Sequence, residues 1–303
     1  MNTLKRKFKG DKGELIFYSA LVALPILQVL IFYFYVNFNS VMLAFKEYSA
    51  EAKGFVWNIN ANFPKLWFDL KTWKLLHALK NSLIVWLFTT VLGTFLAIVF
   101  AYYIYKKWKL AKTFKFFLFL PSVLPSILLV GVYKFFVNEA IPGYMGIFGM
   151  QVSALLDFGD ALFPTVVFYN VWICFGAQLL IYTGAMDQIA PEIIEAGQVD
   201  GVTPIREFFS IVIPIILPTV STFIIANVAT LFTNQANMYA FFGGDTALQA
   251  SDYTIGYYLF YLVGEKGALD NYPYASMLGI ICTFIAFPLT LLARRLLSGK
   301  EEA

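Results

Sequence analysis

Charged residues, histidine and cysteine are all scarce in this chain of 303 residues. Lysine, arginine, aspartate and glutamate together make up 14% of the sequence, whereas a soluble domain carries about 25% of them. Hydrophobic residues make up 59%. So few charges cannot cover a surface that faces water, and the composition therefore predicts an integral membrane protein. The net charge of +3 is small, and nothing in the composition indicates nucleic-acid binding.

The few cysteines and the single histidine argue against a disulfide framework and a metal site. Cys174 and Cys282 both fall inside apolar runs, so we expect two thiols packed as small hydrophobic groups. His77 lies between Lys74 and Lys80, where a surface or interfacial position is expected. One histidine and two distant cysteines do not make a metal site.

The sequence also lacks the G-x-x-x-x-G-K-S/T loop that binds phosphate in ATP-hydrolysing proteins. Gly299 and Lys300 have neither the preceding glycine nor the following hydroxyl residue. We therefore expect a non-catalytic chain that binds no cofactor of its own. The long apolar runs hold no paired carboxylates and no histidine, which argues against a membrane enzyme.

Six apolar runs are long enough to cross a membrane. Each has about 20 residues or more, which spans roughly 30 Å at 1.5 Å per residue. Each must be helical, because lipid offers no partner to unpaired backbone groups. The sequence therefore predicts an all-α protein with six transmembrane helices. The predicted spans are Leu15–Asn37, Ser82–Tyr105, Phe116–Val137, Ala161–Thr183, Ile211–Phe232 and Pro273–Arg294.

Lysine and arginine predict which loops face the cytoplasm, where they are enriched. They gather in the N-terminal tail, in the loop after the second span and in the C-terminal tail. These residues are Lys5, Arg6, Lys7, Lys9, Lys12, Lys106, Lys107, Lys109, Lys112, Lys115, Arg294, Arg295 and Lys300. Six spans place all three segments on one side, so both termini are expected in the cytoplasm. Residues 138–160 contain no lysine or arginine, and residues 233–272 contain only Lys266. Both segments are therefore expected outside.

The segment from Phe38 to Lys80 is rich in lysine, yet the same topology places it outside. Long loops cross the membrane largely regardless of charge. Trp57, Trp67 and Trp73 indicate that part of the segment lies along the outer interface. We therefore expect residues 1–80 to hold the cytoplasmic tail, the first span and this external segment, and residues 81–303 to form the membrane core.

Prolines lie inside three of the predicted spans. They are Pro121 and Pro125 in the third, Pro214 and Pro218 in the fifth, and Pro288 in the sixth. Proline frees a carbonyl group and kinks a helix. Two interpretations remain open: neighbouring helices accommodate ordinary transmembrane prolines, or the bends shape a central cavity.

The loop between the fourth and fifth spans is acidic although it is predicted to face the cytoplasm. It carries one arginine, Arg206, and five carboxylates, which are Asp187, Glu192, Glu195, Asp200 and Glu207. A short helix with apolar contacts and a central carboxylate suits docking to a basic groove on another protein. The alternative is a solvated acidic loop that lies on its own helices.

Local signals in this loop predict two short helices. Pro191 and Pro204 suit first helical turns, and Thr203 suits the N-cap before Pro204. Gly197 and Gly201 suit a sharp reversal between the two helices.

The spacing of the loop residues resembles a known motif. Glu195-Ala196-Gly197, Gly201, Ile211 and Ile213-Pro214 match the EAA motif of the membrane subunits of binding-protein-dependent ABC importers. The motif has Ala at Gly197 and Leu at Ile213. Asn81-Ser82 resembles the start of the family's permease core. Phe242-Gly243-Gly244 and Tyr274-Ala275-Ser276 resemble segments of its carbohydrate branch, and Arg294-Arg295 resembles the end of maltose- and glycerol-phosphate-type permeases.

This resemblance implies a type I ABC importer permease fold in a bacterial cytoplasmic membrane, with a coupling loop at residues 184–218. It implies five kinds of partner: a second permease in a heterodimer, two ATPase subunits that bind ATP and magnesium, an extracytoplasmic solute-binding protein, a sugar and membrane lipid. The residues expected to couple to the ATPase are Glu195, Ala196, Gly197, Asp200, Gly201, Pro204, Phe208 and Pro214.

Polar and aromatic side chains within the spans are candidates for the substrate path, because sugars bind to polar groups and aromatic faces. The alternative is hydrogen bonding between helices. The candidates are Asn170, Trp172, Gln178, Asn227, Asn234, Gln235, Asn237 and Tyr239. Lys134 is expected to extend its amine towards the external surface rather than bind substrate.

Other functions remain as alternatives to a sugar permease. A permease for a glycerophosphodiester or an amino acid is the first, although an anionic substrate would favour a cluster of cations and the spans supply only Lys134. A membrane enzyme is the second. A channel or secondary carrier is the third, but the spans lack the acid or base of a proton relay.

Overall fold

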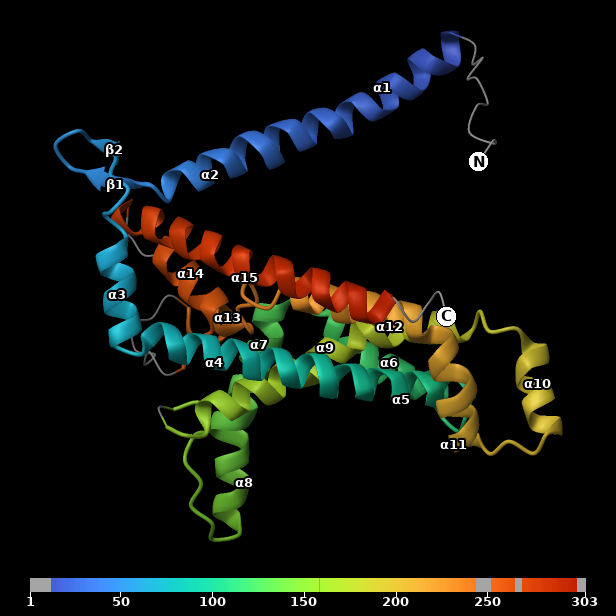
Figure 1. The fold of residues 1–303 in the computed structure, drawn as a ribbon. Helices are drawn as coiled ribbons and strands as arrows, with labels where there is room; N and C mark the ends of the chain where they lie inside the picture. Colours follow the sequence, from blue (N-terminus) through green and yellow to red (C-terminus); the bar gives the residue numbers. More distant parts are fainter. Residues whose placement is uncertain (1–11, 158, 244–251, 265–268, 299–303) are drawn as a thin grey trace. The chain divides into compact units, whose positions relative to one another are not determined.

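The computed structural model describes residues 12–157, 159–243, 252–264 and 269–298 (Figure 1). The chain divides into two compact units. The first comprises residues 1–65 and 269–280, and the second comprises residues 66–268 and 281–303.

The first unit begins with a long apolar helix. It consists of α1 (Lys12–Gln28), the π-helical segment η1 (Val29–Val36) and α2 (Asn37–Leu43). Residues Ile16–Leu43 are long and apolar enough to cross a membrane, so the first predicted span is confirmed and runs six residues past Asn37. Large apolar side chains are exposed on all sides of this helix, which is typical of a helix that faces lipid or another subunit.

A two-stranded antiparallel hairpin follows this helix in the first unit. Strands β1 (Lys46–Ser49) and β2 (Gly54–Trp57) pair with Lys46 opposite Trp57 and Ser49 opposite Gly54. The Asn62 side-chain amide donates to the carbonyl oxygens of Ala44 (2.8 Å) and Lys46 (3.2 Å) and so fixes the start of the hairpin. The all-helical prediction missed this hairpin because strands of four residues are too short to show an alternating pattern.

The second unit holds three long apolar helices that confirm predicted spans. The first runs through α4 (Lys74–Leu87), η2 (Phe88–Gly93) and α5 (Thr94–Tyr105). The second is α9 (Leu162–Met186). The third runs through α11 (Pro204–Glu207), η4 (Phe208–Val212) and α12 (Ile213–Ala229).

Shorter helices and one further long helix complete the described chain. The long one, α15 (Tyr272–Ser298), crosses from the first unit into the second and contains the sixth predicted span. The others are α3 (Phe63–Lys71), α6 (Ala111–Val123), α7 (Ser126–Phe135), η3 (Phe136–Ala140), α8 (Ile141–Ile147), α10 (Pro191–Val199), α13 (Met238–Phe242), α14 (Ile255–Gly264) and η5 (Leu269–Asn271).

The core of the second unit lies where α5 packs against α9. Ala97 and Ala101 on α5 are fully buried, and such small side chains let two helix backbones approach closely. Tyr182 and Met186 on α9 are also fully buried in this cluster. The cluster continues through Phe208 and neighbouring apolar residues of the loop and η4, so the predicted coupling loop packs directly on the membrane core.

The third predicted span, Phe116–Val137, is not one straight helix. Its two parts, Ala111–Val123 and Ser126–Ile147, are bent by 106° at the break between them. Pro125 forces the preceding residue away from helical geometry, and Leu124 is accordingly extended with ψ of 144°. The helix therefore breaks at Pro125, whereas Pro218 and Pro288 lie inside continuous helices.

Candidate functional site

The predicted coupling loop forms two short helices, α10 and α11, at one end of the long helices of the second unit (Figure 1). Pro191 and Pro204 occupy the first turns of these helices, as predicted. The Thr203 hydroxyl accepts a hydrogen bond from the backbone N–H of Arg206 at 3.5 Å, which confirms the predicted N-cap. Gly201 adopts a left-handed φ of 73° between the helices, a conformation that glycine adopts without strain.

Gly197 has a different role from the one predicted, because it lies inside α10 rather than at the reversal. It is buried, and a β-carbon there would lie 3.0 Å from Cδ1 of Ile211. The small residue therefore allows α10 to pack closely on η4. Ile194 is buried on the same helix, whereas Glu195, Ala196 and Asp200 are exposed.

The exposed side of α10 combines a carboxylate with apolar groups. Val199 is 88% exposed and Ile193 is 47% exposed. Glu195 and Glu192 are exposed on the same short helix. Apolar side chains that protrude into solvent beside a carboxylate are suited to contact with another protein.

A buried ion pair connects the loop to the end of α5. Glu207 is 3% exposed, and Nζ of Lys106 lies 3.0 and 3.1 Å from its two carboxylate oxygens. The Tyr102 hydroxyl donates to the carbonyl oxygen of Pro204 at 2.9 Å and lies 3.1 Å from Oε1 of Glu207. Sequence reasoning had counted Glu207 among the loop carboxylates and Lys106 as a marker of topology, and no sequence pattern joins two residues 101 positions apart.

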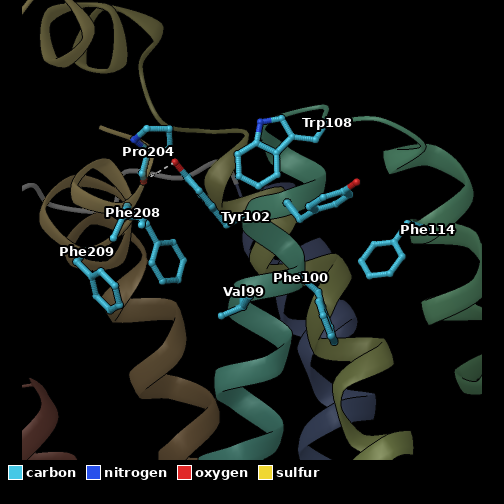
Figure 2. A pocket seen from close by; sticks show the side chains of 10 residues that line it. Val99, Phe100, Tyr102, Trp108, Phe114, Pro204, Phe208 and Phe209 are labelled. Carbon is cyan, nitrogen blue, oxygen red and sulfur yellow. Dashed lines mark hydrogen bonds between the residues drawn. The ribbon is translucent and has the colours of Figure 1, made fainter. Parts of the chain in front are cut away.

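Aromatic residues line a hollow next to this junction (Figure 2). The rings of Tyr102 and Phe208 lie 4.9 Å apart between centroids. Phe208, a predicted coupling residue, is buried in the core. Pro214 lies in the first turn of α12. The hollow, of about 320 Å³, lies beside them, between α5, α6 and the α11–η4 segment.

The predicted substrate-path residues fall into separate groups. Asn170 on α9 donates to the Ala236 carbonyl oxygen at 2.8 Å, and its own side-chain oxygen accepts from Asn237 at 2.8 Å. Gln235 takes part in a local turn, in which its backbone carbonyl oxygen accepts from the backbone N–H of Met238 at 3.0 Å. The two bonds of Asn170 hold the segment before α13 against α9.

Three further candidates lie in other environments. Trp172 stacks on Tyr133, with 6.4 Å between ring centroids. Tyr239 is 46% exposed and lies against Phe260, with 4.6 Å between centroids. Gln178 is buried, and its side-chain oxygen has no hydrogen-bond partner among the described residues. A buried acceptor without a protein partner is suited to bind water or a polar ligand.

Asn227 and Asn234 line a small cleft between the α4–η2 helix and α12. The remaining lining residues are uncharged, and most are polar or aromatic: Ser82, Val85, Trp86, Thr89, Thr90, Thr230 and Leu231. The indole N–H of Trp86 and the hydroxyl of Thr90 are buried without a partner in the described chain. Sequence reasoning missed Trp86, although a tryptophan three and four residues before two threonines on one helix face was a usable signal.

Asn81 and Ser82, which open the second predicted span, fix the start of α14. The Asn81 side-chain amide donates to the Tyr253 carbonyl oxygen at 2.9 Å. The Ser82 hydroxyl accepts from the backbone N–H of Ile255 at 2.8 Å. Ser82 therefore satisfies a helix-terminal donor and also lines the cleft.

Lys134 differs from its prediction. Its amine donates to the carbonyl oxygen of Phe241 at 2.8 Å instead of extending into water. Phe241 lies in the last turn of α13, where carbonyl groups lack helical partners and attract a cation. His77 is exposed on α4, and Cys174 and Cys282 are free, half-buried thiols.

Comparisons with known proteins identify similar chains. A family model described as "Binding-protein-dependent transport system inner membrane component" matches residues 90–298. The sn-glycerol-3-phosphate transport system permease protein UgpA of Pectobacterium atrosepticum is 28% identical over 149 residues. That match covers 48% of this chain and 48% of the relative, so it spans about half the length of each. The glucose import system permease protein GlcT of Saccharolobus solfataricus is 26% identical over 72% of this chain and 75% of its own.

A solved structure shares the fold. The crystal structure of a bacterial ABC transporter involved in the import of the acidic polysaccharide alginate contains a chain that superposes with a TM-score of 0.78. The match covers 94% of this chain and 96% of that chain at 20% sequence identity.

Proposed function

We propose that this chain, which belongs to the family of binding-protein-dependent transport system inner membrane components, forms the translocation path for a sugar or oligosaccharide. In this proposal it pairs with a second permease in the cytoplasmic membrane. Two separate ATPase subunits bind ATP and magnesium, and one of them docks on α10 and α11. An extracytoplasmic solute-binding protein delivers the substrate, and this chain performs no hydrolysis.

The arrangement of α10 and α11 is the observation that carries the coupling role. A coupling element must offer a free surface to the ATPase and be held rigidly to the helices that it moves. α10 offers exposed Glu195 beside exposed Val199. α11 ends at Glu207, which is held to α5 by the buried ion pair with Lys106. Force applied at α10 therefore reaches α5 through packed side chains and a charge pair.

The chemistry of the cleft between α4–η2 and α12 supports a sugar. Its lining includes an indole ring, four hydroxyl groups from Ser82, Thr89, Thr90 and Thr230, and two amides, but no charged side chain. Its volume of about 20 Å³ has room for about one water molecule or one sugar hydroxyl group. Sugars are recognised by such aromatic faces and neutral polar groups. Similarity to a glucose import permease supports the same substrate class.

A phosphorylated glycerol derivative is the second candidate substrate, favoured by the similarity to a permease of sn-glycerol-3-phosphate transport. A phosphate group is bound best by arginine or lysine. Lys134 is the only lysine within the six predicted spans, and it does not line this cleft but donates to the Phe241 carbonyl oxygen. This observation places the second candidate behind a neutral sugar.

The test of the coupling role is charge reversal at Glu195. In cells that express the whole importer, Glu195→Lys is expected to abolish uptake of the transported sugar and to reduce co-purification of the ATPase. The physical reason is that a lysine repels the basic groove that we assign to the ATPase. The measurements are uptake of radiolabelled sugar and the amount of ATPase recovered with the tagged permease.

Glu192→Lys is the matched control, because Glu192 is also exposed on α10 but lies one turn earlier, in its first turn. Membrane abundance of both variants is measured by immunoblot. Equal uptake by the Glu195→Lys variant and the unmodified protein, at equal abundance, would show that the ATPase does not dock through this carboxylate.

A further inference from the structure

Lysine side chains converge on a pocket where α5, α6 and α9 meet. The pocket has a volume of about 440 Å³, and Lys107, Lys112 and Lys115 line it together with Asp187. Within the described part of the chain, none of these three lysines has an ion-pair or hydrogen-bond partner for its amine. The pocket therefore offers three cationic groups against one carboxylate.

The pocket lies at the depth of lipid headgroups. The α4–η2–α5 span ends at Tyr105 and the α9 span ends at Met186. Lys107 and Asp187 follow these ends by one or two residues. Leu110 and Trp108, which also line the pocket, are 77% and 44% exposed, as is common for apolar and aromatic groups at a membrane interface.

An apolar hollow begins beside the same tryptophan. Trp108 lines both the lysine pocket and the hollow of about 320 Å³ that Figure 2 shows. Val99 and Phe100 line the hollow further along α5, away from the loop (Figure 2). Val99 lies six residues before the end of the span, which places it about 9 Å deeper at 1.5 Å per residue. The hollow is thus lined by aromatic and aliphatic side chains at acyl-chain depth.

We propose that this corner of the α5–α6 loop binds an anionic phospholipid of the adjacent leaflet. Lys107, Lys112 and Lys115 hold the phosphate-bearing headgroup, and an acyl chain lies in the hollow beside Trp108. Basic pockets between transmembrane helices bind anionic headgroups in this way. The hollow is also lined by Pro204 and Phe208, so the bound lipid contacts both α5 and the proposed coupling segment.

The charge distribution favours a lipid over an acidic protein as the occupant. Lys106, the lysine next to this pocket, is already paired with Glu207, so the charges left for a ligand are those of the three pocket lysines and Asp187. A protein partner would leave the apolar hollow within the span unfilled. A soluble anion would use the lysines but not the hollow.

Brominated lipids test the proposal, because bromine in an acyl chain quenches nearby tryptophan fluorescence. The purified importer is reconstituted in phosphatidylcholine with increasing phosphatidylglycerol, and either lipid carries the bromine. The contribution of Trp108 is the difference between the unmodified protein and the Trp108→Phe variant. We expect brominated phosphatidylglycerol to occupy the site with about 30-fold preference over phosphatidylcholine, since Asp187 offsets one of the three lysine charges.

The triple variant Lys107→Gln, Lys112→Gln, Lys115→Gln is expected to lose this preference. The matched control is Lys53→Gln, Lys71→Gln, Lys80→Gln, which removes the same charge from exposed lysines elsewhere and should keep the preference. Inorganic phosphate at millimolar concentration is the third arm, and it should leave the quenching unchanged.

Two results overturn the proposal. Equal quenching of Trp108 by the two brominated lipids in the unmodified importer excludes a preference for anionic lipid, whatever the folding of the lysine variants. Loss of quenching on addition of inorganic phosphate shows a simple anion site with no lipid specificity. These measurements do not depend on transport, so a failure of the lipid proposal can be distinguished from a failure of the coupling role tested at Glu195.

Discussion

Glu207 and Lys106 form a charge pair that is almost entirely shielded from water. The side chains are 4% and 17% exposed. Burying two charges is costly, and a buried pair adds little net stability over an apolar pair of the same shape. Removing one partner is different, because the other charge is left buried without compensation. Replacing one residue of the pair is therefore expected to lower stability, whereas replacing both with apolar residues of similar shape is expected to leave stability nearly unchanged.

The first prediction concerns this pair. Glu207→Gln is expected to destabilise the junction of α11 with α5 by about 3 kcal/mol and to reduce uptake per ATP hydrolysed. Thermal unfolding of the purified importer and transport-coupled ATPase activity in liposomes are the measurements. The double variant Lys106→Met, Glu207→Leu should regain stability without regaining coupling. A Glu207→Gln variant as stable as the exposed control Glu192→Gln would contradict the account.

The second prediction concerns Trp86, whose indole N–H lies buried without a partner in the described chain. If this group donates to a sugar hydroxyl, Trp86→Phe keeps an aromatic face but removes the donor. A lost hydrogen bond of about 1 kcal/mol raises KM for uptake roughly fivefold. Trp67→Phe, at an exposed position on α3, is the control. An unchanged KM in the Trp86 variant would remove this residue from the substrate path.

At the scale of elements, apolar length and local capping chemistry were readable from the sequence. The spans at Ser82–Tyr105 and Ala161–Thr183 reappear within α4–η2–α5 and α9. Thr203, Pro191 and Pro204 predicted the ends of α10 and α11 because caps depend on neighbouring residues only.

The break at Leu124 was less predictable, although Pro125 was among the prolines identified within the predicted spans. A proline within an apolar run either stays inside a helix, as Pro218 does, or ends it, as Pro125 does. The packing of neighbouring helices decides between these outcomes, and one sequence contains no record of that packing. For the same reason, the sequence did not predict that Lys106 pairs with Glu207 or that Trp86 lines the cleft.

The third prediction concerns Gly256 in the first turn of α14. A β-carbon there would lie 2.5 Å from the carbonyl oxygen of Asn234, so an alanine would push α14 away from the segment that carries Asn234. Gly256→Ala is expected to lower stability by about 1–3 kcal/mol, as overpacking does. Thermal unfolding of the purified importer measures the change. Gly131→Ala is the control, since open space surrounds Gly131 on α7; equal melting temperatures would contradict the close approach.

At the scale of the whole molecule, the chain has the fold of ABC importer permeases, and the all-helical membrane class followed from composition alone. The family followed from the EAA spacing. The sequence did not predict the β1–β2 hairpin, whose strands are too short to show an alternating pattern, or the grouping of residues 269–280 with residues 1–65 in one unit, which depends on contacts between distant residues.

The fourth prediction concerns the orientation in the membrane. Lysine and arginine counts predict that α10 lies in the cytoplasm and that residues 138–160 lie outside. With Cys174 and Cys282 replaced by serine, Ser153→Cys should react with a membrane-impermeant maleimide in intact cells. Gln198→Cys, on the exposed side of α10, should react only after permeabilisation. Both Ser153 and Gln198 are exposed, so burial does not explain a difference in their labelling. Labelling of Gln198→Cys but not of Ser153→Cys in intact cells would show the opposite topology.

The 106° bend between α6 and α7 has a consequence for biogenesis. α6 has 13 residues, about 20 Å of helix, which is shorter than the hydrocarbon layer. α9, on which α6 packs, begins only at Leu162. At about 5–20 residues per second of synthesis, the broken segment leaves the ribosome a few seconds before its covering helix exists. We therefore expect α6 and the break that follows it to be accessible to the insertion machinery and to proteases during that interval.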